Sequence, residues 1–236
     1  MTNKSEIWIG GKHSVESVIT KKKRKIFKIV TLKENNYLEE NNIKYEIKST
    51  KFFNKIFPNS HIAHQGIAAL VSPLPTVLLE DISREPIIVM LDGVTDPMNI
   101  GAIIRNCVAF GVQSIIVKDR EFNHNSAATI KASSGTIEEI NLCKVSNLSN
   151  AIKFLKTKNF WISCLENNAA TDVNKHKWDD KNVIIFGAEG DGVSQLIKEK
   201  CDHKLKIPIH KKVESLNVSS AVAITLNSIY FAKNFI

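Results

Sequence analysis

From Pro86 onward, the chain alternates short, mostly apolar runs with segments of helical character. The apolar runs lack the polar alternation of a strand that has one face in water, and they lie at 87–91, 114–118, 160–165 and 183–186. Segments with helical spacing separate them, at about 99–110, 126–134, 151–158 and 193–200. A strand at 137–145, a last strand at 204–208 and a terminal helix after Asn217 complete the pattern. Strands buried on both faces need helices on both sides, so this region is predicted to be an α/β domain with a mostly parallel sheet.

The residues before Pro86 have a different pattern. Short strands are predicted at 26–32, 44–49 and 67–71, after a strand, a glycine turn and an amphipathic helix within 7–20. Prolines 73, 75 and 86 then mark a connection between the two regions. We therefore predict a small α/β domain at 1–76, a linker at 77–85 and the larger domain at 86–236.

The net charge of +8 and the pI near 9.2 favour a polyanionic partner, most simply nucleic acid or the ribosome. The excess of positive charge is unevenly distributed, because residues 1–80 carry 13 Lys+Arg against 7 Asp+Glu. The four cysteines show no CxxC spacing and the seven histidines no HExxH motif, so neither a metal site nor a disulfide framework is predicted. No apolar run approaches a membrane span, and the expected location is cytoplasmic.

The stretch 207–226 joins a short strand, a basic loop and an apolar helix. Pro208 lacks a backbone donor and should close the strand at the edge of a site. Ser215 and Asn217 are residue types that cap helix N-termini, where unpaired N–H groups can also hold a ligand. Taken singly, each is better explained as a simple helix cap.

A glycine-rich segment, Gly187-Ala-Glu-Gly-Asp-Gly192, follows one buried strand and precedes a helix. Its G-x-x-G-x-G spacing differs from the G-x-G-x-x-G of dinucleotide-binding loops, and Glu189 would repel a phosphate. The loop is more compatible with a small cationic or neutral ligand, while an ordinary strand-to-helix turn is the simpler alternative.

Asn99 and Arg105 lie in the first helix of the sheet region, where most other positions are apolar. A lone arginine on such a helix is most often on a solvated face. Its planar guanidinium is also suited to phosphate, and the small neighbours would let a polyanion or a second subunit approach.

Three segments together, 91–105, 185–192 and 207–219, resemble the ordered motifs of the SpoU (TrmH) family of RNA ribose 2′-O-methyltransferases. The front region, with Gly10-Gly-Lys-His13 and His64-Gln-Gly66, is similar to the ribosomal-protein-like substrate-binding domain of the RlmB branch of that family. The resemblance implies S-adenosylmethionine-dependent 2′-O-ribose methylation of RNA, most specifically of a guanosine in 23S ribosomal RNA.

The resemblance further implies a C-terminal domain with a trefoil knot, a homodimer formed through that domain, and no metal. S-adenosylmethionine, which leaves as S-adenosylhomocysteine, would be bound by Gly187, Ile207 and Leu216. The polar family positions at the methyl-transfer site match Asn99, Arg105, Glu189, Ser215 and Asn217. Arg105 would anchor a phosphate and stabilise the developing alkoxide, because a protonated guanidinium is a poor base.

A basic run follows the first predicted helix and consists of Lys21, Lys22, Lys23, Arg24 and Lys25. We expect it to contact the RNA backbone together with His13, although charge runs are usually solvated surface and His13 can be structural. Two other functions stay open. One is a tRNA ribose methyltransferase, because the motifs indicate the reaction but not which RNA is modified. The other is a non-catalytic RNA-binding or assembly factor. A Rossmann oxidoreductase is disfavoured by the glycine spacing.

Overall fold

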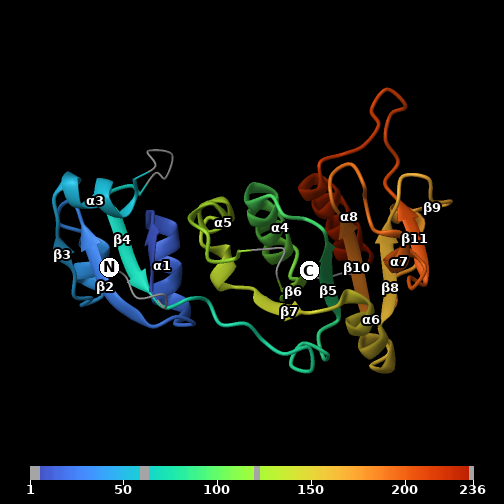
Figure 1. The fold of residues 1–236 in the computed structure, drawn as a ribbon, viewed down its shortest axis with the longest axis horizontal. Coiled ribbons are helices and arrows are strands. Elements are labelled where there is room, and N and C mark those ends of the chain that lie inside the picture. The colour runs from blue at the N-terminus through green and yellow to red at the C-terminus, as the bar shows by residue number, and fades with distance from the viewer. Residues whose placement is uncertain (1–5, 59–63, 120–122, 234–236) are drawn as a thin grey trace.

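The chain folds around two separate sheets that follow one another along the long axis of the molecule (Figure 1). The computed structural model describes residues 6–58, 64–119 and 123–233. A four-stranded sheet belongs to the front of the chain and a seven-stranded sheet to the rest. The predicted fold class, a mostly parallel α/β domain behind a small α/β region, is confirmed.

The front sheet has the strand order β1-β4-β2-β3. Both β1 (Ile7–Gly10) and β2 (Ile26–Thr31) run antiparallel to β4 (Ile67–Val71), and β3 (Glu46–Ile47) runs parallel to β2. Three helices accompany it: α1 (Lys12–Lys21), α2 (Asn36–Glu40) and α3 (Thr50–Ile56). Buried apolar side chains from the strands and helices form its core, among them Ile9, Val15, Leu38 and Phe53.

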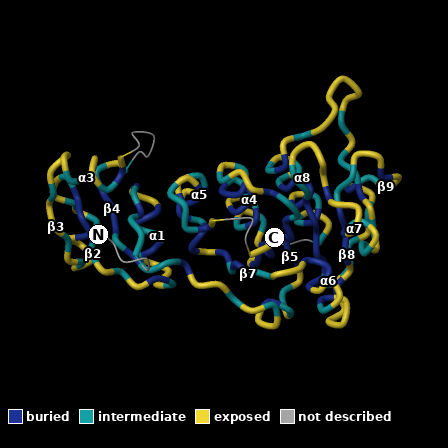
Figure 2. Tube along the Cα trace, viewed as in Figure 1, coloured by how far each residue is buried: buried dark blue, intermediate teal, exposed yellow. Residues whose placement is uncertain are grey.

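The large sheet has the strand order β7-β6-β5-β10-β8-β11-β9, and all of its ladders are parallel. Its strands are β5 (Ile87–Asp92), β6 (Ser114–Lys118), β7 (Asn141–Val145), β8 (Trp161–Leu165), β9 (Thr171–Asp172), β10 (Asn182–Gly187) and β11 (His203–Lys206). The central strands are buried on both faces, as Figure 2 shows for β5, and this explains their apolar sequences.

Helices cover both faces of the large sheet. On one face, α4 (Pro97–Ala109) and α8 (Val218–Ala232) pack together over β5 and β10. On the other face lie α6 (Leu148–Thr157) and α7 (Gln195–Lys198), while α5 (Ala127–Ser133) packs on α4. Two 3-10 turns, η1 (Thr136–Glu138) and η2 (Val173–Lys175), complete the unit. None of the helices in the described part of the chain has the length and apolar character that a membrane span requires.

The C-terminal part of the chain returns across the sheet. After β11, the segment 207–217 projects away from the body of the protein (Figure 1) and then leads into α8, which contacts α4 and β10. The return brings α8 beside α4, the first helix of the large sheet region. The trefoil knot expected for this region stays a prediction.

The prediction of a strand at 137–145 is wrong for the first part of that range. Residues Thr136–Glu138 form the turn η1, and β7 begins only at Asn141. The reason is tertiary, because the Glu138 side chain is buried against Arg24 from the front of the chain. An alternation of apolar and polar residues could not reveal that partner. The strand predicted at 44–49 is likewise reduced to β3, and the aromatic segment after it forms the helix α3.

The segment predicted as a linker is packed against the large sheet. The Val77 amide donates to the Leu142 carbonyl over 3.0 Å, and Ile82 is 1% exposed within the core beneath α6. These contacts fix the connection to the second unit. The domain boundaries at 76 and 86 stay a prediction.

Candidate methyl-transfer site

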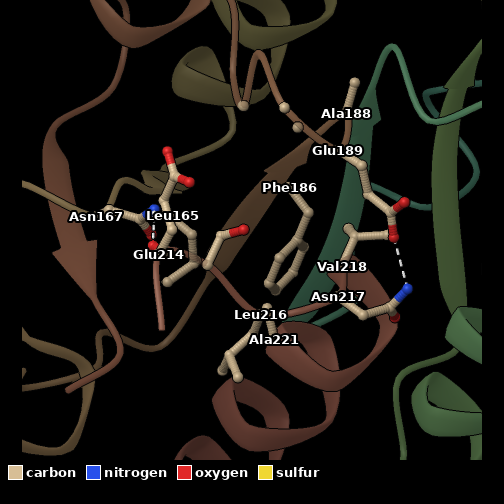
Figure 3. Close-up of a pocket in the computed structure, with 14 residues that line it drawn as sticks. Leu165, Asn167, Phe186, Ala188, Glu189, Glu214, Leu216, Asn217, Val218 and Ala221 are labelled. Atoms are coloured by element: carbon tan, nitrogen blue, oxygen red, sulfur yellow. Dashed lines mark hydrogen bonds between the residues drawn. The ribbon is translucent and has the colours of Figure 1, made fainter. Parts of the chain in front are cut away.

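A cavity of about 580 Å³ opens at the ends of β8 and β10 (Figure 3). Three segments line it: the residues that follow β8, the glycine-rich loop after β10, and the start of α8. Its lining comprises Leu165, Asn167, Phe186, Gly187, Ala188, Glu189, Gly190, Gly192, Glu214, Ser215, Leu216, Asn217, Val218 and Ala221. The carboxyl ends of parallel strands are where open α/β sheets bind their ligands.

Gly187 is required at its position because another part of the same loop folds back on it. A Cβ placed there would lie 1.9 Å from the backbone carbon of Gly192. The loop is closed by a hydrogen bond from the Gly192 amide to the Ala188 carbonyl, 3.0 Å long. The glycine motif therefore forms a tight turn whose backbone lines the cavity.

Asn99, Glu189 and Asn217 form a hydrogen-bonded cluster at this cavity, although they are far apart in the sequence. The Nδ2 group of Asn99 donates to Glu189 Oε1 over 3.0 Å. Nδ2 of Asn217 donates to the same oxygen over 2.5 Å, as Figure 3 shows. Asn217 Nδ2 also approaches Asn99 Oδ1 at 2.8 Å. All three residues are exposed or partly exposed, so the cluster is open to a ligand.

Helix caps place two of these side chains. Asp96 caps α4 by accepting from the Asn99 amide over 2.9 Å, which fixes Asn99 in the first turn. Asn217 is the N-cap of α8, and its Oδ1 accepts from the Ser219 amide over 2.9 Å. With its oxygen committed to the helix, the Asn217 amide nitrogen is directed at Glu189. The predicted capping role of Asn217 is confirmed, whereas Ser215 lies three residues before α8 begins and does not cap it.

The residues expected to bind a cofactor lie in two adjoining cavities. Gly187, Ser215 and Leu216 line the large one. A smaller neighbouring cavity of about 70 Å³ is lined by Ile207 and again by Leu216. The structure thus brings these predicted residues together around Leu216.

Arg105 lies apart from them. It is exposed on α4 and is not among the residues that line either cavity. It shares α4 with Asn99, six positions further along the helix.

Asn167 and Glu214 line the cavity but were not predicted from the sequence. The Asn167 side chain donates to the Glu214 carbonyl over 3.1 Å and so joins the end of β8 to the segment before α8 (Figure 3). The position of Leu165 at the carboxyl end of a predicted buried strand was the available signal. Ligands bind at the carboxyl ends of parallel strands, so a polar residue just after such a strand is a candidate site residue, as the glycine loop is.

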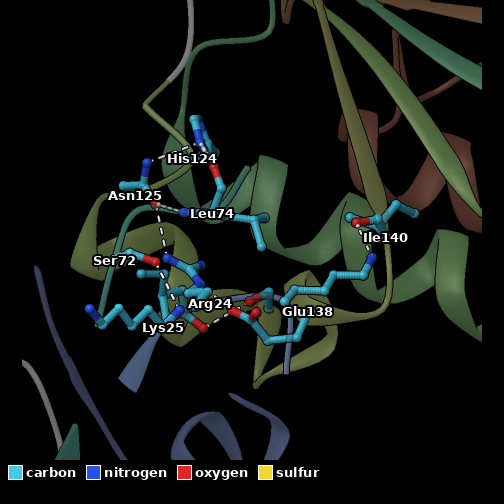
Figure 4. Close-up of polar contacts among 11 residues, drawn as sticks. Arg24, Lys25, Ser72, Leu74, His124, Asn125, Glu138 and Ile140 are labelled. Carbon is cyan, nitrogen blue, oxygen red and sulfur yellow. Dashed lines mark hydrogen bonds and ion pairs between the residues drawn. The ribbon is translucent and has the colours of Figure 1, made fainter. Parts of the chain in front are cut away.

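The structure corrects the expectation that the whole basic run faces RNA. Arg24 is buried and donates from Nε to Glu138 Oε1 over 2.7 Å, while its Nη1 donates to Asn125 Oδ1 over 3.0 Å (Figure 4). Burial lowers the pKa of Arg24 and raises that of Glu138, and their mutual attraction opposes both shifts. Arg24 therefore connects the front of the chain to the large domain and is not available to contact RNA.

Two lysines of the run face the same junction. Lys23 Nζ donates to the Ile140 carbonyl over 3.1 Å and has a pKa lowered by partial burial (Figure 4). Lys21 pairs with Glu139 at 2.6 Å. These contacts occupy both ammonium groups in the structure.

His13, Lys22 and Lys25 remain predicted RNA contacts. The His13 side chain is 74% exposed, while its carbonyl packs against Gly135, which has a φ of 86° and no room for a Cβ. Both lysines are exposed. Within the described residues, no group of three or more His, Cys, Asp or Glu side chains is placed to hold a metal ion.

The family model of the SpoU rRNA methylases matches residues 86–227. The chain belongs to the SpoU rRNA methylase family. A second family model, for the substrate-binding domain of RNA 2′-O ribose methyltransferases, matches residues 8–77. The chain is accordingly an RNA methyltransferase, and the two family models match separate stretches of it.

Similar proteins agree with this assignment. A Staphylococcus epidermidis protein assigned to the TrmH family of tRNA/rRNA methyltransferases is 34% identical over 238 residues, covering 95% of each chain. A Synechocystis protein named as a tRNA/rRNA methyltransferase is 35% identical over 189 residues, covering 77% of this chain and 49% of its own. The fold matches that of the SpoU methyltransferase AviRb from Streptomyces viridochromogenes, solved with AdoMet, at a TM-score of 0.85 and 18% identity, covering 98% of this chain and 91% of that one.

Proposed function

We propose that this SpoU-family protein transfers a methyl group from S-adenosylmethionine to a ribose 2′-hydroxyl of RNA. The observation that supports it best is the cluster of Asn99, Glu189 and Asn217 at the cavity lined by Gly187 and Leu216. The cluster offers fixed polar groups to a ribose, and the cavity offers an adjoining space for a small molecule. Holding two reactants in a defined geometry supplies a large part of the rate of such a transfer.

The residues of the cavity fit the cofactor. A volume of about 580 Å³ lies in the range of small-molecule sites. Leu165, Phe186 and Leu216 present apolar surface suited to an adenine ring, while Glu189 and Glu214 add negative charge suited to a cationic ligand. When bound, the cofactor supplies an electrophilic methyl group.

The polar cluster would orient the acceptor ribose. Glu189 is held by two amide donors on one oxygen, which leaves its other oxygen to accept from a hydroxyl. Asn99 and Asn217 fix the carboxylate in place, and their own positions are set by the caps of α4 and α8.

Arg105 would anchor an RNA phosphate next to the acceptor. Its exposure on α4 leaves the guanidinium open to a polyanion, and the planar fork suits phosphate oxygens. A protonated guanidinium stabilises the alkoxide that develops on the ribose but does not remove its proton. The proton would leave to a phosphate oxygen or to water.

The proposed target is a guanosine of 23S ribosomal RNA. The match of the front region to a substrate-binding domain and the excess of positive charge before residue 80 support an RNA substrate, and the resemblance of that region to the RlmB branch favours 23S ribosomal RNA. A tRNA substrate is the second candidate, because the relatives in Staphylococcus epidermidis and Synechocystis are named for both RNAs. A non-catalytic RNA-binding factor is disfavoured by the intact cluster of Asn99, Glu189 and Asn217.

We further propose that the protein acts as a homodimer through its large domain. Three large apolar side chains remain exposed on the neighbouring helices α4 and α8: Met98 at 58%, Ile224 at 37% and Phe231 at 64%. We propose that these side chains are buried against the partner subunit, since a joined apolar surface favours such burial.

Two measurements test the function. Calorimetric titration with S-adenosylhomocysteine should give saturable binding, whereas no binding at millimolar concentration would contradict the cofactor assignment. Mass spectrometry of ribose methylation in ribosomal RNA and tRNA from cells that lack the protein should then show loss of one 2′-O-methylguanosine in 23S ribosomal RNA. Loss in tRNA alone would replace the proposed target with the second candidate.

A further inference from the structure

The first half of β2 carries an exposed aromatic ring. Phe27 of β2 is 41% exposed, whereas Ile29, Val30 and Thr31 of the same strand are buried. The Nζ atom of Lys25 lies 5.1 Å from the centre of the Phe27 ring. One face of the strand thus presents an aromatic surface with a positive charge over it.

An open groove of about 590 Å³ runs beside this ring, between β2 and the segment that leads into β3. Its lining comprises Phe27, Lys28, Ile29, Ile43, Lys44, Tyr45 and Glu46. The Tyr45 hydroxyl donates to Glu39 over 2.5 Å, which holds the second aromatic ring in position. The groove therefore combines two aromatic rings and apolar side chains with lysines.

The charge of the groove is predominantly positive. Lys28 and Lys48 both pair with Glu46 at 2.7 Å, one on each carboxylate oxygen. Lys44 lines the groove and is exposed, and Lys25 flanks it at Phe27. Four lysines thus lie in or beside the groove, against two glutamates, Glu46 in its lining and Glu39 at the Tyr45 hydroxyl.

We propose that this groove binds an unpaired segment of the RNA substrate, with a base stacked on Phe27 and neighbouring phosphates held by Lys25 and Lys44. Single-stranded nucleic acid binds where aromatic rings accept stacked bases and lysines follow the backbone. A base-paired duplex keeps its bases stacked on one another and offers no free face to Phe27. The inference rests on the proposed function, because it assumes that RNA is the substrate.

The groove is remote from the methyl-transfer site. β2 and β3 lie at one end of the molecule, and the loops after β8 and β10 lie towards the other (Figure 1). The groove would therefore anchor RNA outside the target nucleotide. It also gives the basic run two separate roles: Lys21, Lys23 and Arg24 face the junction between the sheets, whereas Lys25 faces the groove.

The test compares ring-removing and ring-retaining substitutions. Fluorescence anisotropy with a short single-stranded oligoribonucleotide should show about 10- to 100-fold weaker binding for Phe27→Leu, because stacking is lost while apolar bulk is kept. Phe27→Tyr should bind within about twofold of wild type, since the aromatic face remains. Thermal unfolding of each variant establishes that the fold is retained. Equal affinities for wild type and Phe27→Leu would overturn the proposal, as would an equal loss with a duplex of the same sequence.

The lysines are tested by salt dependence. Lys25→Ala and Lys44→Ala should each reduce the slope of log affinity against log salt by about 0.7, the contribution of one phosphate on a single strand. Lys51→Ala, exposed on α3, is the matched control and should leave the slope unchanged. Displacement of the oligonucleotide by an acidic peptide at equal concentration would assign the groove to a protein partner and overturn the proposal.

Steady-state kinetics of methyl transfer test this inference separately from the proposed function. Phe27→Leu should raise KM for RNA while leaving kcat unchanged, because the cluster at Glu189 is intact. If wild type methylates RNA and Phe27→Leu has an unaltered KM, the groove proposal fails and the function stands. If wild type methylates no RNA, the proposed function fails whatever the oligonucleotide binding shows.

Discussion

Arg24 and Glu138 form an ion pair between the two sheet regions, with Nε and Oε1 2.7 Å apart and side chains only 0% and 1% exposed. Arg24 follows α1 of the front region, and Glu138 ends the turn η1 beside the large sheet. The pair is reinforced by Asn125, which accepts from Arg24 and from the Leu74 amide, both at 3.0 Å. The junction is therefore a buried polar contact. Its charged groups have these hydrogen-bond partners only when both sheet regions are folded and packed together.

Removal of either partner should destabilise the protein strongly. Arg24→Met leaves a buried carboxylate without its counter-ion, and such a loss costs about 3–5 kcal/mol. Lys21→Ala is the control, because the pair of Lys21 with Glu139 is 39% and 34% exposed and should contribute at most about 1 kcal/mol. Urea unfolding checks both values. An Arg24→Met variant within about 0.5 kcal/mol of wild type would show that the junction does not stabilise the fold.

Stability should fall in mild acid because of His124. This side chain is buried next to the Leu74 carbonyl, and burial, aided by Lys144 and Arg24, lowers its pKa below the ordinary 6.5. The unfolded chain then binds a proton that the folded chain resists. The stabilisation is present above pH 6.5 and is lost as the pH falls from 6.5 towards the lowered pKa, by at most about 1.4 kcal/mol per pH unit.

Unfolding free energies of wild type and His124→Asn at pH 7.5 and 5.5 test this prediction. The loss on acidification should be smaller in the variant. Burial also lowers the pKa of His176, which the variant retains, so part of the acid effect should persist. An identical loss in both proteins would exclude His124 as a source.

Gly187→Ala should abolish cofactor binding, because the added methyl group would collide with the backbone of Gly192 at 1.9 Å. The backbone must move, and the cavity that it lines must change. Gly111→Ala controls for the general cost of replacing a glycine: its φ of 74° makes alanine strained by about 1–2 kcal/mol, but no atom lies within 4 Å. Titration with S-adenosylhomocysteine should show normal affinity for Gly111→Ala. Normal affinity for Gly187→Ala would contradict the assigned cavity.

Arg105→Lys should lower kcat/KM by at least about tenfold, because an ammonium retains charge but cannot form two parallel hydrogen bonds to phosphate. Affinity for S-adenosylhomocysteine should be unchanged, since Arg105 does not line the cavity. Steady-state kinetics with RNA as the varied substrate measures the effect. Turnover equal to that of wild type would remove the guanidinium from the mechanism.

Much of the site follows from the order of its motifs. Strands buried on both faces predict a parallel sheet, and the carboxyl ends of its strands bring Glu189 and the loop of Gly187 to one edge. Asn217 could be predicted as a helix cap from its residue type and the apolar helix after it. Its contact with Asn99, 118 positions earlier, depends on α8 packing against α4.

What could not be predicted depends on contacts between distant segments. The sequence presents Lys21 to Lys25 as one basic run, but successive side chains point in different directions, and only the structure shows Glu138 and Glu139 opposite Arg24 and Lys21. The turn η1 was predicted as strand for the same reason. Phe27 was assigned to a strand by its pattern, while the groove beside it depends on how the segment before β3 packs along β2.

The central claim is that the cavity and its polar cluster transfer methyl groups to ribose. The most direct measurement incubates the purified protein with methyl-labelled S-adenosylmethionine and unmodified 23S ribosomal RNA, then identifies the labelled nucleoside by mass spectrometry. The account predicts label in 2′-O-methylguanosine, and it predicts that the Asn217→Ala variant incorporates much less label than wild type. Label on a base, or no label in any RNA, would contradict it.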